Sequence, residues 1–132
     1  MTDSTDTLRL YGLTLLRVVV GAVFIAHGVQ KLIFMGIPNV AGFLGQLGVP
    51  QPNIAAIVLT VAESLGGVSL VLGAFTRYAA FVLAFDMAMA ILLVHSKNGF
   101  FLPDGFEYAM VLLGANLCLV LSGGGALEVA GS

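Results

Sequence analysis

Four long runs of apolar residues, separated by short links, dominate the chain. They run over Tyr11–Phe34, Ile54–Phe75, Arg77–His95 and Phe106–Ser122. A bilayer is crossed by ~17–25 helical residues, and the apolarity is continuous rather than alternating, which excludes barrel strands. Because backbone groups in lipid must be hydrogen-bonded internally, each run is predicted to be an α-helix. The links are short, so the sequence predicts a single all-α domain over residues 1–132, an antiparallel four-transmembrane-helix bundle.

The first link and the two chain ends have their own patterns. Between Gly36 and Pro52, apolar residues recur at the i, i+3, i+4, i+7 spacing of a helix face, which predicts a short interfacial helix lying on the membrane. These residues are Val40, Phe43, Leu44 and Leu47. The polar residues 1–7 predict a short disordered N-terminus, and the glycine-rich segment from Ser122 onward predicts a flexible tail.

The composition places the chain in a membrane. Hydrophobic residues make up 59% and charged residues 9%, against ~45–50% and ~25% in soluble domains. Five basic residues and a net charge of −2 leave no basic surface for nucleic acid. The single cysteine, Cys118, excludes an internal disulfide and a cysteine-cluster metal site. The acidic start and the long first run also argue against a cleaved signal peptide.

Glycines lie inside several of the apolar runs. Examples are Gly21 and Gly28 in the first run and Gly66 and Gly67 in the second. Small residues let the backbones of membrane helices approach closely. We therefore expect these glycines to serve helix packing rather than ligand binding.

Basic residues near the ends of the runs give a weak indication of orientation. An even number of spans places both termini on one side, with Arg9 and Arg77 on that side and Lys31 and Lys97 near the other. The two sides then carry equal numbers of basic residues, so the positive-inside rule decides only when Arg17 is counted with the N-terminal side. The predicted orientation is N-in/C-in.

Polar residues inside the runs fall into two layers, since each residue of a helix rises 1.5 Å. One layer, near the middle of the membrane, holds Arg17, Glu63 and Asp86; the other, toward the far side, holds His27, Lys31, His95 and Glu107. Charges in a bilayer should face the bundle and find partners. We expect a buried ion pair between Arg17 and either Glu63 or Asp86. Asp86 and His95 point in opposite directions on one helix, so Asp86 is expected inside and His95 at the rim.

The second layer, together with Glu63, is the candidate ligand or proton site. An imidazole beside a carboxylate can pass protons, hold a quinone carbonyl or bind a metal, but a histidine that is merely hydrogen-bonded at a helix end fits equally well. His27, His95 and Glu107 are metal-ligand types without a diagnostic spacing, so no metal site is predicted. The Arg17 pair is equally consistent with a purely structural role that fixes helix register.

The residues from Arg17 to Leu32 follow the pattern R-x3-G-x2-F-x2-H-G-x2-K-L. This pattern resembles the opening signature of the DoxX family of bacterial membrane proteins. Further matches are Glu63-Ser64-Leu65-Gly66-Gly67, Gly73, Thr76-Arg77, His95 with Gly99-Phe100, and Glu107. The chain departs from the family at Ala126-Leu127-Glu128, where Ser-Leu-Asp is common, and Asp86 lies outside the signature.

The resemblance implies a four-helix protein of the bacterial inner (plasma) membrane. Members of the family include a subunit of a thiosulfate:quinone oxidoreductase, and others are associated with oxidative-stress enzymes. The family positions in this chain are Arg17, His27, Lys31, Glu63, His95 and Glu107. The resemblance does not say which of them is catalytic.

Three functions fit these features. The first is a redox-linked subunit or accessory that binds a small molecule such as a quinone, with His27 and Lys31 contacting it and Glu107 or Glu63 managing protons. The sequence has no flavin, haem or iron–sulfur signature, so electrons would come from a partner oxidoreductase or a substrate. The second is a non-enzymatic scaffold or assembly factor for a partner oxidoreductase. The third is a small-molecule permease, for which a homodimer would help to enclose a pathway. Whether the chain is an enzyme stays open.

Overall fold

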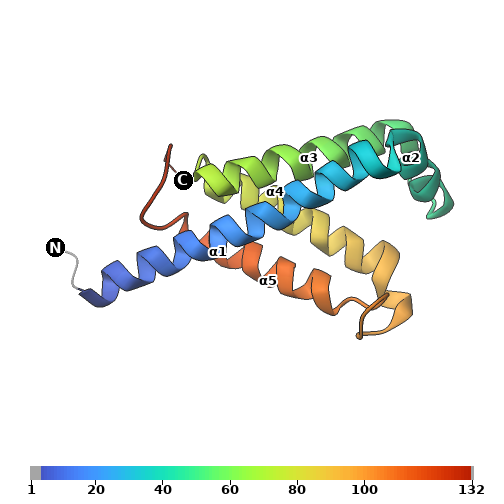
Figure 1. The fold of residues 1–132 in the computed structure, drawn as a ribbon. Helices are drawn as coiled ribbons and strands as arrows, with labels where there is room; N and C mark the ends of the chain where they lie inside the picture. The colour runs from blue at the N-terminus through green and yellow to red at the C-terminus, as the bar shows by residue number, and fades with distance from the viewer. Residues whose placement is uncertain (1–3, 132) are drawn as a thin grey trace.

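The computed structural model describes residues 4–131, and these contain helices and connecting turns but no strand. The helices are, in chain order, α1 (Ser4–Val29), η1 (Gln30–Met35), α2 (Ile37–Gln46), α3 (Pro52–Leu72), α4 (Thr76–Ala90), η2 (Ile91–His95), η3 (Ser96–Asn98) and α5 (Glu107–Ser122). The elements η1 and η2 are π-helical and continue α1 and α4 without a break, while η3 is a single 3₁₀ turn. Figure 1 shows the order along the chain.

Three helical stretches within residues 4–131 are long and apolar enough to cross a membrane. They are Ser4–Met35, Pro52–Leu72 and Thr76–Asn98. The fourth predicted span corresponds to α5, which is apolar but only 16 residues long. The all-helical membrane class is therefore confirmed, whereas a fourth crossing stays a prediction.

The first link and the N-terminus can also be compared with the sequence predictions. The first link contains the expected helix, α2, but its position on the membrane surface stays a prediction. Residues 1–3 of the expected disordered N-terminus lie outside the described residues, and α1 already begins at Ser4.

The long helices run alternately up and down. In Figure 1, α1 and α3 lie along each other, α4 and α5 form a second pair, and the C-terminal segment returns to the end of the molecule at which α1 begins. The core between the helices is apolar. Its largest fully buried members are Phe24 of α1, Leu70 of α3, Leu83 of α4 and Leu119 of α5.

Glycines bring α1 and α3 into backbone contact. A Cβ atom on Gly21 would lie 2.7 Å from the carbonyl oxygen of Gly67, and a Cβ atom on Gly28 would collide with Ser64. Gly67 faces Gly21 in the same way. Since only a residue without a side chain fits there, the packing role expected for these glycines agrees with the geometry. Gly114 differs, because nothing lies within 4 Å of the place where its Cβ would stand.

The C-terminal segment is docked rather than loose, so the expected flexible tail was wrong. The backbone N–H of Ala126 donates to the Leu10 carbonyl (3.1 Å), and those of Val129 and Ala130 donate to the carbonyls of Leu72 (3.1 Å) and Gly73 (3.2 Å). Thr14 Oγ1 accepts two further bonds from Ala126 and Leu127. Residues 123–130, which we call the C-terminal strap, thus tie the beginning of α1 to the end of α3. The physical reason is that the glycines give the backbone the freedom to turn and expose its N–H groups to these carbonyls.

Candidate functional site

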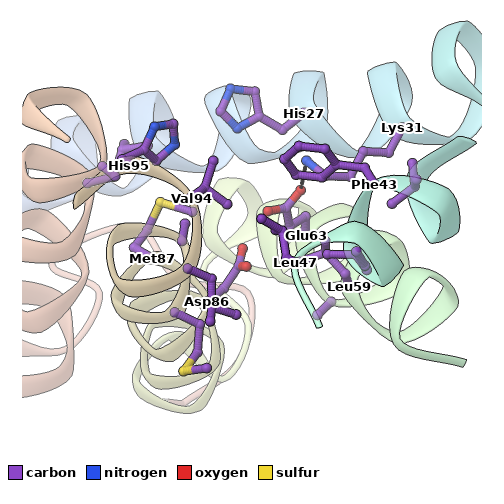
Figure 2. A pocket seen from close by; sticks show the side chains of 18 of the residues that line it. His27, Lys31, Phe43, Leu47, Leu59, Glu63, Asp86, Met87, Val94 and His95 are labelled. Atoms are coloured by element: carbon purple, nitrogen blue, oxygen red, sulfur yellow. Dashed lines mark ion pairs between the residues drawn. The ribbon is translucent and has the colours of Figure 1, made fainter. Parts of the chain in front are cut away.

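A cavity of about 670 Å³ opens between the helices at the end of the molecule opposite the strap. Its volume falls in the ~300–1,000 Å³ range of small-molecule sites. Side chains from α1, α2, α3, α4 and α5 line it, and most are aliphatic or aromatic. The acidic, basic and histidine side chains of the lining, which we call the polar set, are His27, Lys31, Glu63, Asp86 and His95 (Figure 2).

Lys31 and Glu63 form an ion pair inside this cavity. Lys31 Nζ lies 2.7 Å from Glu63 Oε1, and the side chain of Glu63 is only 3% exposed. The pair forms because Gly28, one turn before Lys31, lets α1 pack directly on Ser64, which neighbours Glu63 on α3. A carboxylate as deeply buried as this one requires a partner, and Lys31 supplies it.

The expected pairing of Arg17 with Glu63 or Asp86 was wrong. Arg17 is 2% exposed but does not line the cavity. Its Nη1 donates to the carbonyl oxygen of Gly124 at 2.8 Å, and its charge faces that of Glu128. The guanidinium fits because Gly73 and Gly124 have no side chains: a Cβ on Gly73 would lie 2.6 Å from Nη1. The C-terminal strap therefore provides the counter-charge that was expected within the spans.

Asp86 joins the polar set from α4. It lines the same cavity as Glu63 and Lys31. Asp86 Oδ2 is buried and has no hydrogen-bond partner. The expectation that Asp86 faces the interior agrees with this geometry, and Figure 2 shows its side chain directed toward Glu63.

His27 stands between two aromatic rings. The imidazole meets Phe24 of α1 and Tyr108 of α5 edge-on, with ring centroids 6.2 Å apart in both cases. These contacts fix the plane of the ring while its nitrogens remain open to a hydrogen-bonding ligand, because within the described residues no hydrogen bond to them is formed. His27 is thereby positioned at the wall of the cavity.

His95 lines the cavity together with Asp86, although the two were expected on opposite sides of one helix. The expectation assumed 100° per residue, but Ile91–His95 is π-helical, and the wider turn changes the angle at which His95 projects. His95 Nδ1 lies 3.0 Å from the carbonyl oxygen of Asp104, which can only accept. Nδ1 is therefore the protonated nitrogen, and in a neutral ring Nε2 is left as an acceptor.

Glu107 does not belong to the cavity, although the sequence analysis grouped it with His27 and Lys31. Its Oε2 accepts a hydrogen bond from the backbone N–H of Leu102 at 2.9 Å. Glu107 thus holds the loop before α5 in place. A first-turn acid at the start of a helix, where backbone N–H groups are unpaired, would have suggested this role from sequence.

Some lining residues were missed by the sequence analysis. Phe43 and Leu44 of α2, and Leu47 directly after it, were assigned to a membrane-lying helix, yet all three line the cavity. Tyr108 was not considered, although an aromatic hydroxyl directly after Glu107 was visible. Within residues 4–131, no group of three metal-ligating side chains is placed to hold a metal ion.

These observations define the class: an all-helical membrane protein whose bundle encloses an apolar cavity with a charged, hydrogen-bonding set. The DoxX family profile matches residues 12–96, and the chain belongs to the DoxX family. An uncharacterized protein of Haemophilus influenzae is 36% identical over 94% of this chain and 92% of its own length. CatD of Bacillus subtilis, whose name gives oxidoreductase only as a proposed activity, is 33% identical over 82% of this chain and 78% of its own.

A third relative is the inner membrane protein YphA of Escherichia coli. It is 36% identical over 55% of this chain and 51% of its own length. No solved structure matches the chain. The comparisons therefore support a membrane protein of the DoxX family and leave the occupant of the cavity to be argued from its chemistry.

Proposed function

We propose that the protein is a redox-linked accessory of the bacterial inner membrane that binds a small amphipathic molecule, such as a quinone, in its cavity. The observation that carries this proposal is a cavity of ligand size whose wall is mostly apolar and holds the polar set. An apolar pocket with a few converging polar groups is the usual form of a small-molecule site. The name of the CatD relative supports a redox association. Electrons would come from a partner oxidoreductase.

The π-helical turns give this proposal independent support. Within the described residues the π-helical segments are η1 and η2, and they carry Lys31 and His95 into the cavity. Such turns are less favourable than α-helix and occur frequently at functional sites. A bundle that served only as a scaffold would have no need of them at this place.

The ligand proposal is tested by replacing His27 with leucine. We expect affinity for a short-chain quinone analogue to fall by roughly tenfold, because a hydrogen bond of about 1.4 kcal/mol to the ligand is lost. Quenching of tyrosine fluorescence by the quinone in detergent-solubilised protein measures the affinity, with Tyr108 at the wall of the cavity. The control is Met35→Leu, an apolar change of similar volume in the same lining, which should leave affinity within about twofold. Equal affinities for wild type and the His27 variant would remove His27 from the site.

We also propose that α5 completes a fourth span and that both termini face the cytoplasm. The return of the strap to the beginning of α1 supports this. In a Cys118→Ser background, single cysteines are placed at Thr5, Lys97 and Leu127. An impermeant maleimide should label the Lys97 position in intact spheroplasts and the other two only after lysis. Labelling of the Thr5 and Leu127 positions from opposite sides would contradict the fourth span.

A further inference from the structure

If every side chain of the polar set had the charge that it carries in water at neutral pH, the set would have a net negative charge. Glu63 and Asp86 both line the cavity, the Asp86 side chain is directed toward Glu63 (Figure 2), and Lys31 forms the ion pair with Glu63. The other groups that face them are His27 of α1, His95 of η2 and Tyr108 of α5, as well as the apolar lining. Two carboxylates and one ammonium would leave one negative charge without a partner in an apolar wall.

An unpaired charge in such surroundings is far more costly than a neutral carboxyl. When two carboxyls face one apolar site, one of them therefore stays protonated, as in the paired carboxyls of other proteins. Glu63 is the carboxylate, since its Oε1 lies 2.7 Å from Lys31 Nζ. The proton then resides on Asp86, whose Oδ2 is buried, lines the cavity and has no hydrogen-bond partner.

We propose that the polar set is electrically neutral, with Asp86 protonated, and that the Asp86 hydroxyl is the hydrogen-bond donor that selects an uncharged amphiphile with a carbonyl oxygen. The inference rests on the proposed function and names the class of ligand for the same cavity. A carboxylate ligand would meet Glu63 with no free cation to receive it. A cationic ligand would have to displace Lys31 from its ion pair. A neutral carbonyl compound accepts from Asp86 without disturbing either charge.

The protonation state can be observed without any ligand. Infrared spectroscopy of the reconstituted protein at neutral pH should show the carbonyl stretch of a protonated carboxylic acid. Asp86→Asn should abolish that band, whereas Asp104→Asn, which neutralises a carboxyl that does not line the cavity, should retain it. A spectrum without such a band in the wild-type protein, or a band that survives in Asp86→Asn, would overturn the assignment.

The donor role is tested by binding. Asp86→Asn keeps a donor and should bind the quinone analogue within about threefold of wild type. Asp86→Leu removes the donor and should weaken binding by roughly tenfold. An apolar replacement of a buried polar group is often tolerated, so the leucine variant should fold; gel filtration in detergent checks this. Equal binding by the leucine and asparagine variants would overturn the donor role.

The selection against charge is tested by creating a free cation. The double variant Glu63→Gln/Asp86→Asn removes both carboxyl groups of the polar set, so Lys31 is left without an anionic partner. Its affinity for laurate should be at least tenfold higher than that of wild type. Adding Lys31→Met should remove that gain. Unchanged laurate binding in the double variant would overturn the inference. If wild-type protein binds neither the quinone analogue nor any other uncharged amphiphile, the proposed function fails, while the infrared result still decides the protonation of Asp86.

Discussion

Replacing Arg17 with alanine should lower the free energy of unfolding by about 3–5 kcal/mol. The guanidinium is buried and donates to the Gly124 carbonyl. Its loss would leave an empty space beside that carbonyl. The Thr76 hydroxyl, which already has no hydrogen-bond partner, would border the same space. The substitution would also remove the cation that faces Glu128. Titration of the purified protein from mild detergent into sodium dodecyl sulfate, followed by circular dichroism, measures the loss.

The matched control is Arg9→Ala on the same helix. Arg9 is an exposed arginine whose Nη1 lies 3.1 Å from Asp6 one turn away. Exposed pairs of this kind contribute ~0–0.5 kcal/mol, so the control should unfold almost as wild type does. If Arg17→Ala unfolds at the same detergent fraction as Arg9→Ala, the strap does not depend on Arg17.

The second large effect is expected at the crossing of α1 and α3. Gly21→Ala would place a methyl group 2.7 Å from the Gly67 carbonyl oxygen and 2.9 Å from the Val71 backbone nitrogen. Backbone atoms cannot yield as a flexible side chain does, so the two helices must separate. Overpacking of this kind costs about 1–3 kcal/mol. The same detergent titration gives the free energy. The proposed binding of the quinone analogue should weaken too, because Lys31 and Glu63 move apart with the helices.

Gly12→Ala on α1 controls for helix propensity. Nothing lies within 4 Å of the place where a Cβ on Gly12 would stand. Alanine is favoured over glycine in a helix by up to ~1 kcal/mol, so this variant should be as stable as wild type or slightly more stable. Destabilisation of both glycine variants to the same degree would mean that the crossing is not responsible.

The sequence predicted the helices well because continuous apolarity and length are local properties. The limits of α3, and of α4 taken together with η2, lie within a few residues of the predicted runs Ile54–Phe75 and Arg77–His95. Two errors were non-local. The partner of Arg17 lies in a segment 107 residues away, and nothing in the local pattern connects the two. Flexibility was assigned to that segment from its glycines alone, although glycines also permit close docking.

The candidate site was predicted in part. His27, Lys31, Glu63, Asp86 and His95 all line one cavity, although they had been assigned to two layers. The layers were built from the rise of an ideal helix, which ignores tilt and the π-helical turns that contain Lys31 and His95. Glu107 has the residue type and the expected depth of a site residue, but its carboxylate accepts a hydrogen bond from the loop before α5 instead. The residue types were enough to find most of the cavity's polar side chains. The assumption of regular helices led to the errors in where those side chains lie.

The docking of Arg17 on the strap has a consequence for biosynthesis. Gly124 emerges from the ribosome 107 residues after Arg17. During that interval the first helix enters the bilayer with an arginine whose final partner does not yet exist, so the guanidinium must be held by water or lipid headgroups near the membrane surface. The strap that lets the first helix settle is thus synthesised only after α1, α3, α4 and α5. The final packing of α1 therefore waits for a segment that follows α5 in the chain.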